Sequence, residues 1–162
     1  MNKEMLVAGV TIDPMTKSPI VVLRDRESSC ALPIWIGVFE ANAIVLFLEG
    51  VELSRPMTHD LLKSVIERSG AQLQRVEITH VRDNTYYAVL HMERSGGSFT
   101  VDSRPSDAIA LALRCEVPIV VADGVLENAV ALEGGDGQTE GKDKLTELLE
   151  KMDPEQFSKY KM

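Results

Sequence analysis

The sequence predicts an α+β domain in which a mixed, largely antiparallel β-sheet carries three main helices, followed by a C-terminal amphipathic helix. Pairs of apolar, strand-length segments separated by turn residues predict antiparallel hairpins. Apolar residues at helical spacing predict the three main helices, at residues 39–48, about 58–69 and 105–114. A continuous apolar run at residues 117–122 is typical of an interior strand reached by a crossover connection, which makes the sheet mixed.

The first three strands are predicted near the N-terminus. Segments 5–12 and 20–24 flank residues 13–18, where Asp and Pro supply turn chemistry, so the two segments form a hairpin. Segment 31–36 is the third predicted strand. Pro33 lies inside it, and because proline has no amide hydrogen it predicts a sheet edge or a β-bulge.

Two helices follow these strands. In residues 39–48 the apolar stripe is wide enough for a central core helix, and Gly50 is its predicted C-terminal stop. The second helix covers about residues 58–69. It presents one apolar face, made of Leu61, Leu62, Val65 and Ile66.

Three further strands are predicted, at residues 73–82, 85–94 and 99–102. Asp83-Asn84 joins the first two, since this pair tolerates the left-handed torsions of a tight hairpin. A symmetric turn centred on Gly96-Gly97 joins the next two. In an unbulged ladder this turn places His91 opposite Asp102.

The chain divides into one domain and a short tail. Residues 1–132 form the α+β domain, and the region 124–132 is a short helix or loop. Residues 133–141 are rich in Gly, Glu and Asp and predict a flexible linker. Residues 142–162 predict an amphipathic helical tail. Its apolar stripe consists of Leu145, Leu148, Leu149 and Met152.

Composition and charge limit the classes of function. The net charge of −8, from 25 acidic and 17 basic residues, argues against broad electrostatic affinity for nucleic acid, without excluding a nuclease with a local basic patch. Cys30 and Cys115 lie far apart, and no secretory signal is recognised, so they predict reduced thiols in a cytoplasmic protein. No stretch approaches the roughly 20 apolar residues of a membrane helix, so no membrane partner is expected.

The segment Val101–Arg114 places polar residues at the start of a buried helix. Pro105 suits a first helical turn, where amide hydrogens have no intrahelical partner, and Ser103 is the predicted N-cap. Apolar residues then recur at helical spacing through Leu113, so the helix is expected to be mostly buried. Its start gathers four polar side chains beside the core, namely Asp102, Arg104, Ser106 and Asp107.

A second Ser-Arg-Pro sequence, Ser54–Pro56, precedes the helix at about residues 58–69, and Thr58, His59 and Asp60 follow it. Each of these two Ser-Arg-Pro corners puts an arginine beside the free amide hydrogens and positive dipole end of a helix, which suits an anion. The structural alternative is that the serine caps the helix, the proline starts it and the arginine neutralises a nearby aspartate.

Three blocks resemble the signature blocks of the bifunctional nuclease family, namely Gly37–Ile44, Arg55–Leu61 and Val101–Ala112. The resemblance covers about residues 5–132, and the Arg-Pro-Ser-Asp-Ala run from Arg104 is fairly specific. It implies combined DNase and RNase activity, a compact α+β fold and self-association, so nucleic acid and a homo-oligomeric partner are expected. Some members carry an appended UVR-type helical module, which is not expected here because the tail offers only one amphipathic helix and a short cap.

Phosphodiester hydrolysis requires an activated water, stabilisation of charge at phosphorus and help for the leaving oxygen. The predicted catalytic residues are His59, Asp60, Asp107 and Glu40. His59, expected to be exposed on a first helical turn, is the best candidate for a general base or metal ligand. Metal nucleases hold divalent ions with clustered carboxylates, so Asp102 and Asp107 are predicted to bind Mg²⁺ or Mn²⁺. Arg55 and Arg104 are predicted to bind phosphate oxygens.

Two other interpretations stay open from the sequence. In the first interpretation, the chain is a non-enzymatic, self-associating regulatory or anion-binding module. The aromatic content of 5% favours this, because aromatic side chains on which single-stranded bases could stack are scarce. Alternatively, Asp102, Arg104 and Asp107 form a buried ion-pair network that fixes helix to sheet. Geometry discriminates between these, because an enzyme requires both Ser-Arg-Pro corners to face one open cleft with Glu40 and His59.

Overall fold

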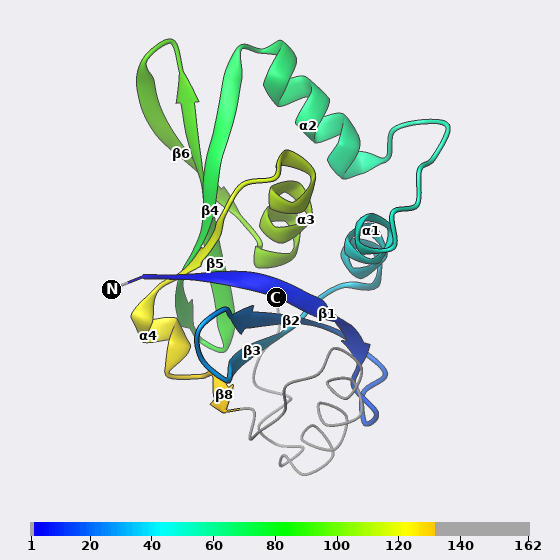
Figure 1. Cartoon of the computed structure of the whole chain (residues 1–162), viewed down its shortest axis with the longest axis vertical. Coiled ribbons are helices and arrows are strands. Elements are labelled where there is room, and N and C mark those ends of the chain that lie inside the picture. Colours follow the sequence, from blue (N-terminus) through cyan, green and yellow to red (C-terminus); the bar gives the residue numbers. More distant parts are fainter. Residues whose placement is uncertain (1, 132–162) are drawn as a thin grey trace.

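A single mixed sheet organises the chain. The computed structural model describes residues 2–131, so the predicted linker at 133–141 and the predicted helical tail at 142–162 lie outside the described residues. Within that range an eight-stranded sheet has the order β6-β5-β4-β7-β1-β2-β3-β8, and helices pack on it (Figure 1). The α+β class is therefore confirmed.

The element bounds follow the sequence patterns closely. The strands are β1 (Lys3–Ile12), β2 (Pro19–Asp25), β3 (Cys30–Trp35), β4 (Ala71–Arg82), β5 (Thr85–Arg94), β6 (Gly97–Ser103), β7 (Ile119–Val121) and β8 (Val130–Ala131). The helices are α1 (Val38–Leu48), α2 (Thr58–Arg68), α3 (Pro105–Cys115) and the short α4 (Asp123–Leu126). Across the described residues, no helix has the length and hydropathy needed to cross a membrane.

The crossover through α3 makes the sheet mixed, as predicted. It carries the chain from the edge strand β6 to β7 in the interior of the sheet, where β7 pairs parallel with β4 and antiparallel with β1. The strand is shorter than predicted because Val117 still belongs to the end of the helix, its N–H donating to Ala112 O at 3.1 Å. Among residues 2–131, Pro33 lies at a sheet edge, as predicted, since β8 pairs there only with Cys30 and Ala31 of β3.

The predicted register of the β5–β6 hairpin is wrong. The loop is the pair Ser95-Gly96, with φ of 52° and 74°, so Gly97 already pairs with Arg94. A two-residue turn of this kind needs positive φ at both central residues, and Ser95 adopts it although Gly97 would do so at a lower cost. His91 consequently lies opposite Thr100 rather than Asp102, and its Nε2 is 2.7 Å from Glu77 Oε2.

The central core helix is α3, not α1. Five consecutive residues of α3, Ala108–Ala112, are at most 1% exposed, whereas Phe39 of α1 is 88% exposed. Both α1 and α2 pack against α3 (Figure 1), and each also contacts the sheet, α1 at β1 and β2 and α2 at β4. In α2 the only buried residue is His59, so the predicted apolar face of this helix is largely exposed.

A buried carboxylate closes the β1–β2 turn. Asp13 is 1% exposed, and its Oδ2 accepts hydrogen bonds from Trp35 Nε1 at 3.0 Å and Thr16 Oγ1 at 2.9 Å. Its Oδ1 accepts one from the Met15 N–H at 2.9 Å. Desolvation acts to raise the pKa of Asp13, but these hydrogen bonds outweigh it and hold the pKa below its ordinary value.

We expect Asp13→Ala to lower the free energy of unfolding by about 1–3 kcal/mol, because it leaves the Trp35 N–H without an acceptor. Folding lowers the pKa of Asp13, so its ionised carboxylate stabilises the fold fully above pH 3.8, the ordinary pKa of an aspartate. This stabilisation is lost as the pH falls through the lower pKa of the folded state. Urea unfolding followed by the fluorescence of the single tryptophan measures the loss. Glu27→Ala, an exposed carboxylate, is the matched control, and an equal loss in both variants would contradict the role of Asp13.

Candidate functional site

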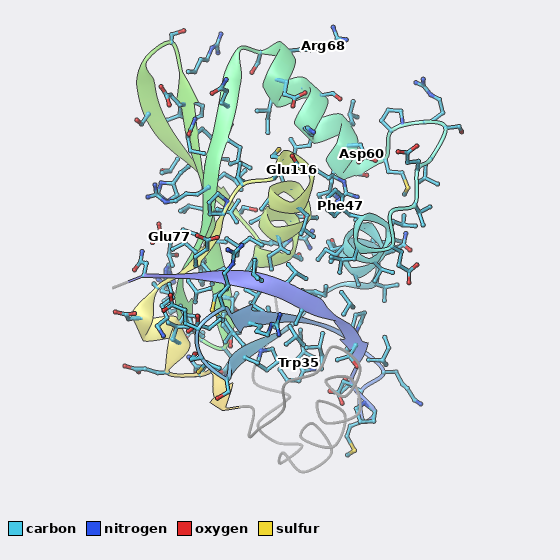
Figure 2. The ribbon with its side chains drawn as sticks, in the orientation of Figure 1. Trp35, Phe47, Asp60, Arg68, Glu77 and Glu116 are labelled. Atoms are coloured by element: carbon cyan, nitrogen blue, oxygen red, sulfur yellow. The ribbon has the colours of Figure 1, made fainter. Side chains whose placement is uncertain are left out.

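The two Ser-Arg-Pro corners face one open pocket of about 680 Å³. Its walls come from α1, the loop that follows it, the start of α2 and both ends of α3. Figure 2 labels two of the lining residues, Phe47 on α1 and Asp60 at the start of α2. The polar lining residues include Glu40, Arg55, His59, Asp60, Arg104, Asp107 and Arg114. The geometry that favours an enzyme is therefore present.

The N-terminal caps of α2 and α3, which line the pocket, differ from each other and from the predicted serine caps. Pro105 is the first residue of α3, as predicted, but the N-cap is Arg104 and not Ser103, whose Oγ donates to Arg104 O at 2.9 Å. At α2 the N-cap is Met57, one residue after Pro56. Asp60 Oδ2 accepts a hydrogen bond from the Met57 N–H at 3.0 Å and so closes this helix start.

Arg104 and Asp107 form the centre of a polar network. Arg104 Nε donates to Asp107 Oδ2 at 2.8 Å, and Arg104 Nη2 donates to Glu40 Oε1 at 2.5 Å. The other oxygen of Asp107, Oδ1, lies 2.9 Å from His59 Nε2. Gly37, the N-cap of α1, leaves room for the Glu40 carboxylate, since a Cβ there would collide with it. Three segments far apart in sequence thus meet in one network.

His59 is buried rather than exposed, so that part of the prediction is wrong. The residue is 7% exposed, yet it lines the pocket. A carboxylate only accepts hydrogen bonds, so in the neutral ring of His59 the Asp107 contact fixes the proton on Nε2 and leaves the lone pair on Nδ1. His59 Nδ1 has no hydrogen bond within the described residues. It is nevertheless not among the buried polar side-chain atoms without a partner, of which Ser106 Oγ is the one case in that range, so Nδ1 keeps contact with solvent.

Asp60 is held by Arg114, a pocket residue that sequence reasoning missed. Arg114 is 9% exposed and donates from Nε to Asp60 Oδ1 at 2.7 Å. Its two remaining nitrogens donate to Ala110 O and Ala43 O, both at 2.9 Å. Desolvation raises the pKa of Asp60, but the Met57 N–H and Arg114 outweigh it and lower that pKa. An arginine ending an apolar helix was the available signal.

The two remaining predicted residues lie in different surroundings. Arg55 lines the pocket, is exposed and makes no hydrogen bond or ion pair with the described part of the chain. Asp102 is exposed on β6 opposite Val89 and does not line the pocket. The structure therefore does not bring Asp102 together with Asp107, and the predicted ion-pair network contains Glu40 and His59 in its place.

The residues present do not fit a Mg²⁺ or Mn²⁺ site as they are arranged. Over residues 2–131, no group of three or more His, Cys, Asp or Glu side chains could hold a metal ion. The pocket carboxylates are already paired, Glu40 and Asp107 with Arg104 and Asp60 with Arg114. We therefore derive no step through a metal.

The fold and the pocket together define an α+β domain with a solvent-accessible histidine–carboxylate–arginine site. The family model described as the bifunctional nuclease domain matches residues 21–133. The chain belongs to the bifunctional nuclease domain family, which confirms the resemblance seen in its three sequence blocks.

Relatives of two kinds share this domain. An uncharacterized protein of Mycobacterium tuberculosis is 36% identical over 162 residues, covering 95% of this chain and 97% of the relative. Bifunctional nuclease 2 of Oryza sativa subsp. japonica is 32% identical over 117 residues, covering 70% of this chain and 36% of the relative. Bifunctional nuclease 2 of Arabidopsis thaliana is 29% identical over 107 residues, covering 64% and 32%. The chain thus spans about a third of the length of these plant relatives.

We expect Arg114→Met to lower the free energy of unfolding by about 3 kcal/mol, because it strands the Asp60 carboxylate and the Ala43 carbonyl. Chemical unfolding monitored by circular dichroism measures the change. Arg68→Met, at the exposed end of α2, is the matched control and is expected to stay within about 0.5 kcal/mol of the parent. Equal unfolding midpoints for all three proteins would refute the anchoring role of Arg114.

Proposed function

We propose that this chain hydrolyses phosphodiester bonds of DNA, RNA or both in the pocket lined by the two Ser-Arg-Pro corners. The observation that carries the proposal is the linked set Glu40–Arg104–Asp107–His59, which lines a pocket open to solvent. Family membership supports it, since the plant relatives are named bifunctional nucleases. The proposed partner is nucleic acid.

In this proposal His59 is the general base. A water molecule in the pocket gives a proton to Nδ1 as its oxygen forms the new bond to phosphorus. The bond from phosphorus to the leaving sugar oxygen breaks, and that oxygen takes a proton from solvent. Asp107, hydrogen-bonded to Nε2, orients the ring and stabilises the imidazolium that forms.

The arginines of the two corners supply the positive charge. Arg104 is 54% exposed in its side chain, and within residues 2–131 its Nη1 has no hydrogen-bond partner, so Nη1 can donate to a phosphate oxygen. Arg55 reaches the same pocket with its whole guanidinium free of described partners. Asp60 is not proposed as a catalytic residue, because Arg114 and the Met57 N–H occupy both of its oxygens.

The second candidate is a non-enzymatic, self-associating regulatory or anion-binding module. The exposed apolar side chains on α2 and near it favour it, because large exposed apolar patches mark interaction surfaces. This surface includes Val51, Leu53, Met57, Leu61, Leu62 and Val65. A second copy fits it, since a two-fold contact would bring this same apolar surface of both copies together and cover it. A cytoplasmic location stays a prediction.

We expect purified protein to cleave DNA or RNA, and His59→Ala and Asp107→Ala each to lower kcat by about 100-fold or more. The assay runs in Mg²⁺, in Mn²⁺ and in chelator, which also tests the predicted metal requirement. His80→Ala, an exposed histidine outside the pocket, is the matched control and should keep full activity.

Asp102→Ala in the same assay separates the sequence-based metal prediction from the pocket. We expect no loss, because Asp102 does not line the pocket. Activity that survives unchanged in both the His59 and Asp107 variants would overturn the proposal, since it would come from a different site or a contaminant.

We expect the chain to self-associate and Val65→Lys, on the exposed face of α2, to raise the dissociation constant by about tenfold or more. Sedimentation velocity over a concentration series measures the change. Val101→Lys, exposed on the edge strand β6, is the matched control. A parent protein that stays monomeric throughout the series would exclude this partner.

A further inference from the structure

We propose that the guanidinium of Arg104 occupies the position that a divalent cation takes in a carboxylate-based nuclease, so that the site works with a covalently attached cation instead of a bound metal. The placement itself stands on geometry alone. Only its consequence for catalysis rests on the proposed function.

The contacts of Arg104 are those expected of a bridging cation. Its Nη2 lies 2.5 Å from Glu40 Oε1 and 2.8 Å from Asp107 Oδ2, so one nitrogen joins two carboxylates from different helices. His59 lies on the far oxygen of Asp107 at 2.9 Å. Two carboxylates and an imidazole are a common donor set for Mn²⁺ and related ions. Here a guanidinium stands between the carboxylates.

The charge at this position is permanent. Glu40 and then Asp107 raise the pKa of Arg104, so the guanidinium stays protonated throughout the range in which proteins fold. Glu40 is largely shielded, with 14% of its side chain exposed, and it would be costly to leave unpaired. The cation is thus held by the fold itself and needs no loading from solution.

The surroundings leave no second position for a metal. Asp60 is bound to Arg114, and Asp102 lies outside the pocket. Glu52 also lines the pocket, but among the described residues no three metal-binding side chains are grouped. Removal of Arg104 would leave the Glu40 and Asp107 carboxylates facing a vacated cation position, with His59 on the far oxygen of Asp107.

The test is Mn²⁺ binding to the purified full chain, measured by titration calorimetry and by the electron paramagnetic resonance signal of free Mn²⁺. We expect the parent protein to show no saturable binding at this site. Arg104→Ala is expected to gain saturable Mn²⁺ binding, and Arg104→Gln, which keeps more of the side-chain volume, should gain it too. Adding Asp107→Ala to either variant should abolish the gain.

Two controls separate charge removal from other effects. Arg55→Ala removes an arginine from the same pocket that contacts no carboxylate, so it should gain no Mn²⁺ binding. Arg104→Lys keeps a cation at the position and should gain none either. Saturable Mn²⁺ binding by the parent that Asp107→Ala removes would overturn the inference, as would folded Arg104→Ala and Arg104→Gln proteins with no gain.

The outcome is independent of the nuclease assay. If the proposed function fails, the Arg104 variants still gain Mn²⁺ binding and the inference stands. If the inference fails, either the parent binds Mn²⁺ through Asp107 or the folded Arg104 variants gain no Mn²⁺ binding, while the roles of His59 and the pocket in the nuclease assay remain. Activity of the parent that is unchanged in chelator supports both.

Discussion

The carboxylate of Asp107 is shared between a guanidinium and an imidazole, and the rest of the pocket depends on this sharing. One oxygen faces Arg104 and the other faces His59, so a single side chain in the first turn of α3 sets the positions of both partners. Each partner comes from a different part of the chain. Because α3 is packed against the sheet over most of its length, this carboxylate has a rigid support.

The topology explains how such distant segments meet. The crossover through α3 brings its first turn next to α1 and α2, although these helices end 57 and 37 residues before it. The buried alanines Ala108, Ala110 and Ala112 allow α3 to lie close to its neighbours. Arg114 then ties the three helices together through a carboxylate and two carbonyl oxygens. The pocket therefore forms where three helices converge.

Sequence patterns predicted what depends on local chemistry. Hydrophobic periodicity located the strands and helices, and Pro105 marked the first residue of α3. The register of β6 was missed because Ser95, an ordinary residue, adopts positive φ, which no composition rule indicates. Burial of His59 and the selection of Glu40 over Asp102 depend on long-range packing. Only the assembled fold determines which charged groups meet.

The shallow packing of α2 has a consequence for the wall of the pocket. His59 is its sole buried residue, and much of its attachment is polar, including Lys63 Nζ to Arg114 O at 2.9 Å. Displacing this helix breaks a few hydrogen bonds and withdraws Ile66 from the edge of the core, so it needs less energy than global unfolding. The wall of the pocket that α2 forms is therefore less firmly attached than the sheet and α3.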